Sequence, residues 1–188
     1  MGFKLPEIIA ATEKLDLAYQ VVMSHNSESG VKNSLVSLFQ LLKEDRVLKH
    51  ITNLISQNIN VDIDNWIEEN AKLRGSMVGS GTFDLGKNKS ERFLTSKLIL
   101  EKLIDDEDFP LRIGHNWYSD NYLQNFLIDF LNTFYRELKF MLIDLRVKAE
   151  LNESKNISEQ SIINIVLSGN IQNVQAKNID KSEFTQNE

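Results

Sequence analysis

Apolar residues recur every three or four positions over most of the chain, which is the spacing of an α-helix that buries one face. The longest such stretch runs from Tyr122 to about Leu151. Its apolar positions are Leu123, Phe126, Leu127, Phe130, Leu131, Phe134, Leu138, Met141, Leu142 and Leu145. Charged residues interrupt the stretch, so it is not a membrane span. We therefore predict a central helix roughly 40 Å long, packed on more than one side.

The same spacing predicts shorter helices before the central one. The first begins near Pro6, because proline fits the first helical turn, and ends at about Ser24. A second begins at about Val31 and bends near Glu44–Asp45, where the apolar stripe changes phase, before it ends at Asn58. A third is capped by Asp62 or Asp64 and ends near Arg74, a fourth is capped by Ser90, and Ser119 or Asp120 caps the central helix. Five or six helices around one long helix make a mainly α domain over residues 1–151.

The pattern changes after Leu151. Residues 152–160 form a polar linker, and Ile162–Leu167 is a short β-branched run. Ser168-Gly169-Asn170 is a turn signal, and Ile171–Ala176 can form a second strand. We predict a short β-hairpin or strand element over residues 161–179 and a disordered tail over residues 180–188.

The composition is that of an ordinary globular protein, with 41% apolar and 26% charged residues among 188. The net charge of −6 argues against a general nucleic-acid coat. There is no cysteine, which excludes disulfides and thiolate chemistry. The first residues are too charged for a signal peptide, so we expect a cytoplasmic protein, and the abundance of Asn and Ile suggests a bacterial one.

One stretch is rich in glycine, from Gly75 to Lys89. Within it, Gly81 to Lys87 has the spacing of a phosphate-binding loop. Asn88, however, replaces the hydroxyl residue that would hold Mg²⁺, and a helix rather than a strand precedes the loop. We retain a simpler hypothesis, an anion site for a phosphate-bearing ligand beside a helix start. Its predicted residues are Gly79, Gly81, Lys87, Lys89 and Arg92.

The sequence predicts no catalytic residues, no metal site and no cofactor. The histidines are scattered, and His115 near Asp120 and the acidic run Asp105–Asp108 is the best candidate for an acid–base site. Aromatic residues at helical spacing, which include Phe126, Phe130, Phe134, Tyr135 and Phe140, are expected to be core rather than a cofactor slot.

These observations favour a non-enzymatic interaction or assembly module that binds another protein, a second copy of itself, or both, and no membrane. Self-association is assigned to the C-terminal β element, because an exposed strand edge recruits further strands. Its predicted residues are Ile163, Ile165, Leu167, Ile171 and Val174. Two alternatives stay open: a sensor of anions, nucleotides or nucleic acid that uses Gly75–Lys89, within a defence or toxin system, and an enzyme of an unfamiliar type.

Overall fold

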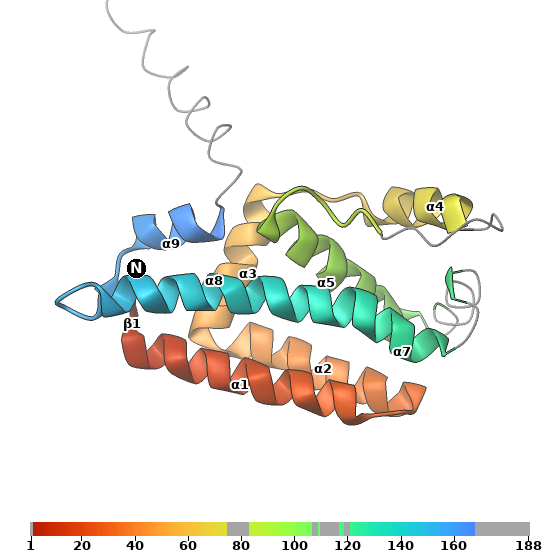
Figure 1. The fold of residues 1–188 in the computed structure, drawn as a ribbon, viewed down its shortest axis with the longest axis horizontal. Helices are drawn as coiled ribbons and strands as arrows, with labels where there is room; N and C mark the ends of the chain where they lie inside the picture. Colours follow the sequence, from red (N-terminus) through yellow and green to blue (C-terminus); the bar gives the residue numbers. More distant parts are fainter. Residues whose placement is uncertain (1, 75–82, 107–108, 110–116, 119–120, 168–188) are drawn as a thin grey trace, which may run out of the picture.

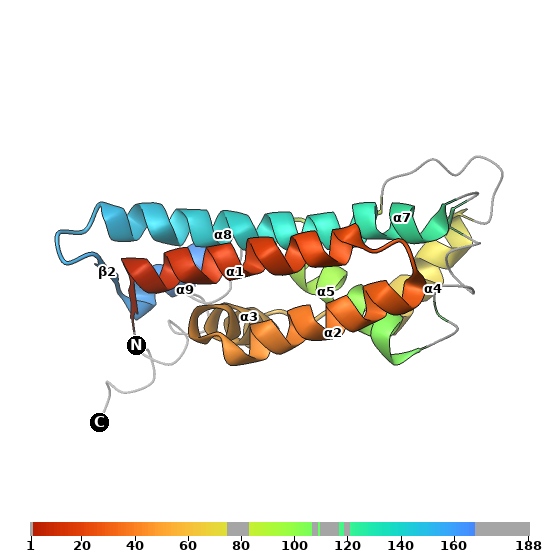
Figure 2. The same ribbon diagram turned by 90° about the horizontal axis from the view of Figure 1, so that it is seen from below.

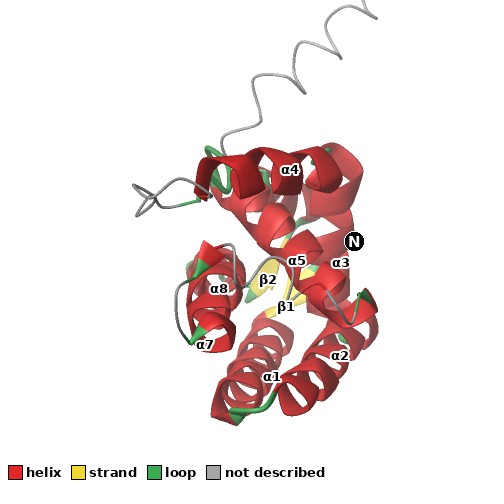
Figure 3. Ribbon diagram, turned by 90° about the vertical axis from the view of Figure 1, so that its right-hand side faces the viewer, coloured by secondary structure: helices red, strands yellow, loops and turns green. Residues whose placement is uncertain are grey.

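The computed structural model describes residues 2–74, 83–106, 109, 117–118 and 121–167. The described chain is mainly helical, as predicted, and its helices form an elongated bundle (Figure 1). Five helices make up most of it: α1 (Leu5–Ser24), α2 (Glu28–Glu44), α3 (Arg46–Asn58), α5 (Lys89–Asp105) and α8 (Asn132–Glu150). Viewed along the bundle, they surround a common interior (Figure 3). A further helix, α4 (Ile63–Arg74), lies at one end.

α1 lies between α2 and α8 and runs antiparallel to both (Figure 2). A polar seam joins α1 to α8. The Tyr19 and Tyr135 rings stack with their centroids 3.9 Å apart. The Asp16 carboxylate accepts a hydrogen bond of 2.8 Å from the Tyr135 hydroxyl and pairs with the Lys139 ammonium at 2.9 Å. These contacts fix one face of α8 against α1.

Side-chain caps separate the helices. Ser27 accepts a hydrogen bond from the Gly30 N–H, so α2 begins three residues earlier than the apolar pattern predicts. The predicted bend is a break at Asp45, whose carboxylate accepts from the Val47 and Leu48 N–H groups and caps α3. Asp62 accepts from the Asn65 N–H, as expected of a cap of α4.

The predicted cap of α5 is wrong. Asn88 accepts from the Glu91 N–H at 3.0 Å and is the cap, whereas Ser90 lies inside the helix and is fully buried. The Ser90 hydroxyl donates to the carbonyl oxygen of Val166. A hydroxyl that looked like a local cap therefore makes a long-range contact. The predicted caps Ser119 and Asp120 lie outside the described residues.

The long helix predicted from Tyr122 is confirmed, and it contains one irregular turn. α7 (Tyr122–Phe126) leads into a π-helical turn, η1 (Leu127–Leu131), and then into α8. Buried Phe126, Phe130 and Phe134 are spaced by four residues, a spacing that drifts around a regular helix with 3.6 residues per turn. The wider π turn absorbs this drift and keeps all three rings in the core.

The C-terminal region departs from the prediction. Ile162–Leu167, expected to be a strand, instead forms the end of a helix, α9 (Glu159–Val166), and its C-cap Leu167. The described strand of this region is β2 (Asn156–Ile157), inside the predicted linker, and it pairs antiparallel with β1 (Phe3–Lys4). Ser158 caps α9, and Ile162 and Val166, one helical turn apart, are fully buried. Packing on α3 and α8 thus overrides the β preference of a β-branched run. The second predicted strand lies outside the described residues.

The core contains large aromatic residues. Phe93, Phe130 and Phe134 are fully buried, and the Phe93 and Phe134 rings stack at 5.1 Å. Trp66 from α4 contacts Phe83 and Trp117 at the end of the bundle, which attaches α4 to the same core. Among the described helices, none combines the length and the apolar character needed to cross a membrane.

Candidate functional site

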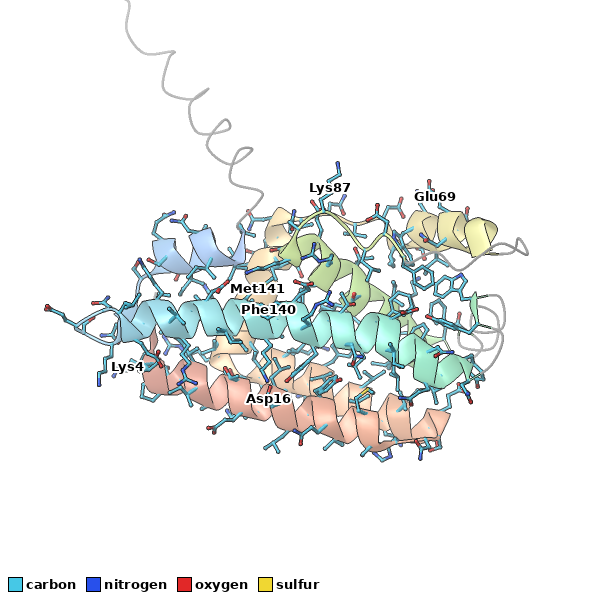
Figure 4. All side chains as sticks on the ribbon, viewed as in Figure 1. Lys4, Asp16, Glu69, Lys87, Phe140 and Met141 are labelled. Carbon is cyan, nitrogen blue, oxygen red and sulfur yellow. The ribbon has the colours of Figure 1, made fainter. Side chains whose placement is uncertain are left out.

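Three of the five residues predicted for the anion site, Lys87, Lys89 and Arg92, lie among the described residues. Gly79 and Gly81 lie outside the described residues. Lys87 is exposed and points away from the bundle (Figure 4). The Lys89 ammonium lies 2.7 Å from the Asp144 carboxylate, and the Arg92 guanidinium binds Glu137. Two of the three predicted cations are therefore already paired with carboxylates of α8.

A buried ion-pair cluster forms where α5 crosses α8. Glu137 is only 2% exposed, and its carboxylate accepts hydrogen bonds of 2.9 and 3.2 Å from Arg92. Arg136 adds bonds of 3.3 and 2.9 Å to the same carboxylate. Burial by itself would raise the pKa of Glu137, but the hydrogen bonds from Arg92 and then Arg136 outweigh it and hold that pKa below its usual range. Glu137 is thus a fixed anion that binds α5 to α8.

A hollow of about 370 Å³ lies beside this cluster and the π turn. Its charged lining residues are the cations Arg92 and Arg136 and the carboxylates Asp84 and Asp129. Asp129 also accepts a hydrogen bond of 2.6 Å from the Tyr118 hydroxyl. Because the two guanidinium groups are balanced by two carboxylates and already hold Glu137, this hollow offers no excess charge to a ligand.

Two of the three histidines, His25 and His50, lie among the described residues. No group of three or more His, Asp or Glu side chains among them is arranged to hold a metal ion. His50 lies beside Glu159, with 2.8 Å between Nε2 and Oε1, in a contact that joins α3 to α9. His115 and Asp120 of the predicted acid–base site lie outside the described residues.

The most conspicuous surface feature is the outer face of α8. Phe140, which we had expected in the core, is 46% exposed, and it is labelled near the middle of the helix in Figure 4. Ile143, Val147 and Leu151 beside it are 39%, 48% and 80% exposed. The spacings of three and four residues place all of them along one side of the helix. We call these four side chains the outer stripe of α8.

The sequence contains a second apolar row that marks the outer stripe, but the apolar period alone does not separate this row from the buried one. Phe140 and Val147 are seven residues apart, and so are Arg136, Ile143 and Glu150. Seven residues are close to two helical turns, so each set forms a row along the helix. A second apolar row on a helix whose other face is fully buried is the pattern of a helix with an additional partner.

The predicted self-association residues differ in burial, and only three of the five lie among the described residues. Leu167 is buried, and Ile163 and Ile165 are half-buried against the core. Ile171 and Val174 lie outside the described residues. The described members of this set therefore belong to the core that α9 completes.

Comparison of the chain with protein-family models, with curated proteins and with solved structures finds no significant match.

Proposed function

We propose that this protein is a helical assembly module that pairs with a second copy of itself through the outer stripe of α8. The observation that carries the proposal is the row of exposed apolar side chains, Phe140, Ile143, Val147 and Leu151. Large apolar side chains gain about 1.5–3 kcal/mol each when they leave water completely. A contiguous set of them along one helix face is a feature of protein–protein contact surfaces.

The charges beside the outer stripe favour a second copy as the partner. Arg136 and Glu150 lie seven residues to either side of Ile143, on the same side of α8. If two copies of α8 pack antiparallel about a twofold axis at Ile143, Arg136 of each copy lies opposite Glu150 of the other. A twofold contact needs a surface that is complementary to itself, and this arrangement meets that need. Within one chain Arg136 pairs with Glu137 and Glu150 pairs with Arg146. Both side chains stay accessible, with 54% and 42% of their surface exposed, so a second copy would add a partner to each.

The packing of α9 favours α8 over α9 as the contact. Ile162, Val166 and Leu167 are all buried against the helical domain. The Ser90 hydroxyl donates to the Val166 carbonyl and ties α9 to α5. An element that is already packed within its own chain has little apolar surface left for another copy, whereas the outer stripe of α8 has no such cover among the described residues.

Sedimentation equilibrium tests the proposal. The parent chain is expected to show about twice the 21.6 kDa mass of one chain. Ile143→Asp places two carboxylates at the twofold axis and is expected to give a single-chain mass. Val36→Asp is the matched control, because Val36 is 51% exposed on α2, away from α8. A parent that sediments as one chain, or an Ile143→Asp variant that keeps the parent mass, overturns the proposal.

A further inference from the structure

A second charged pocket lies away from α8, between α2, α3 and α5. Its volume is about 270 Å³, and three lysines from three different helices reach it: Lys43 at the end of α2, Lys49 on α3 and Lys97 on α5. Phe39 and Leu42 provide its apolar side. Sequence patterns do not predict this group, because Lys97 lies about fifty residues after Lys49 and joins the other two lysines only through the packing of α5.

The charge in this pocket is not balanced, in contrast to the hollow beside Glu137. Glu101 is the acidic residue of the lining, and its carboxylate pairs with the Lys97 ammonium at 2.7 Å. Within the described part of the chain, no carboxylate lies within ion-pair distance of Lys43 or Lys49. The lining therefore contains three lysines, of which Lys43 and Lys49 are exposed, and one carboxylate.

Lys97 is held in place before any ligand arrives. Its side chain is only 17% exposed, Glu101 binds its ammonium, and that ammonium lies 5.8 Å from the centre of the Phe39 ring. A cation over an aromatic face is attracted to it, so both contacts keep the charge at the pocket wall. A cation that is already ordered loses less conformational freedom when a ligand binds.

Neutral polar side chains complete the lining. Thr52, Asn53 and Ser56 follow Lys49 at spacings that keep all four residues on one side of α3. Thr52 is almost fully buried, and its hydroxyl donates to the Lys49 carbonyl at 3.1 Å. The Asn53 amide and the Ser56 hydroxyl add N–H and O–H donors beside the lysines.

We propose that this pocket binds the phosphate group of a small ligand or free phosphate. Lysine is a common phosphate ligand in proteins, and a tetrahedral oxyanion accepts hydrogen bonds from several directions at once. The pocket is smaller than most sites for whole drug-sized ligands, which begin at about 300 Å³, so it suits the anionic group rather than an entire nucleotide. The site is independent of α8 and of the predicted loop site at Lys87.

Calorimetric titration of the full chain at low salt tests the site, with inorganic phosphate in one arm and a nucleoside monophosphate in the other. Binding in both arms assigns the site to the phosphate group, and binding in one arm identifies its source. The double variant Lys43→Gln, Lys49→Gln is expected to lose about tenfold or more in affinity, because it removes two of the three positive charges of the lining. Lys49→Arg keeps the charge and is expected to retain most of the binding.

Two controls locate the effect. Lys148→Gln removes the same charge from the exposed side of α8 and should leave binding unchanged. Lys87→Gln tests the loop site that the sequence predicted, and it should also leave binding unchanged. Loss of binding by the double variant with an unchanged melting curve supports the site. The proposal is overturned if the parent binds neither probe, if the double variant binds like the parent, or if Lys87→Gln abolishes binding.

Discussion

The two faces of α8 carry the same kinds of residues and have opposite environments. On the inner face, Phe134, Leu138 and Leu142 are fully buried. On the outer face, Phe140 and Val147 remain about half exposed. An apolar period of three and four residues therefore establishes that a stretch is helical, but it does not say which partner covers each face. In our account, α1 and α5 cover the inner face and a second copy covers the outer one.

The largest difference between the faces is expected in folding stability. Phe134→Ala and Phe130→Ala should each lower the free energy of unfolding by about 3–5 kcal/mol, because each empties a fully buried aromatic site. Phe140→Ala should change it by only about 0.5 kcal/mol in a dilute, monomeric sample, as is usual for surface positions. Urea unfolding of the three variants measures this. Equal losses for Phe134→Ala and Phe140→Ala would mean that the two faces are equally buried.

Loss of the contact between α9 and the domain should also destabilise the inner core rather than change the outer stripe. Ile162→Ala is expected to lower the free energy of unfolding by about 2–4 kcal/mol, since this fully buried side chain packs where α9 meets the domain. Ile163→Ala, at the half-buried neighbouring position, is the control and should cost clearly less. Thermal melts of the two variants distinguish a buried helix α9 from the hairpin predicted from the sequence. A variant with the parent melting temperature would show that α9 adds nothing to the fold.

A smaller effect is expected at Glu137, which lies between the two faces. Glu137→Gln should lower the free energy of unfolding by about 1–3 kcal/mol near neutral pH. The neutral amide accepts weaker hydrogen bonds from Arg92 and Arg136 than the carboxylate does. The pKa of Glu137 is lowered in the folded state, so its contribution is present above the unfolded pKa and is lost as the pH falls through the folded pKa.

Unfolding at a series of pH values tests this assignment. The parent should lose more stability than Glu137→Gln between neutral pH and the acid range below the ordinary carboxyl pKa. Parallel pH profiles for the two proteins would contradict the role given to this carboxylate.

The sequence predicted the features that depend on local periodicity and missed those that depend on distant neighbours. The helix from Tyr122 was found because its apolar period extends over many turns. The strand at Ile162–Leu167 was predicted wrongly, because β-branched residues favour strands until packing on α3 and α8 decides otherwise. The prediction that Ser90 caps α5 is wrong, because its long-range bond to Val166 has no local signature in the sequence.

The candidate sites follow the same rule. Lys89 and Arg92 were predicted to attract an anion, but the carboxylates that neutralise them come from α8, about fifty residues later in the chain. The lysine pocket could not be predicted, because Lys43, Lys49 and Lys97 are brought together only by the packing of three helices. Charge balance at a site is thus a property of the tertiary structure.

Cysteine cross-linking tests the pairing of α8 most directly, because the chain has no cysteine of its own. Only a residue on a twofold axis faces its own copy, and a disulfide needs Cα atoms within about 4.4–6.8 Å of each other. Ile143→Cys is therefore expected to form a covalent dimer rapidly under mild oxidation. Phe140→Cys and Val147→Cys should react more slowly, and Val36→Cys should stay monomeric. If Ile143→Cys cross-links no faster than Val36→Cys, the outer stripe of α8 is not a twofold contact and the central claim fails.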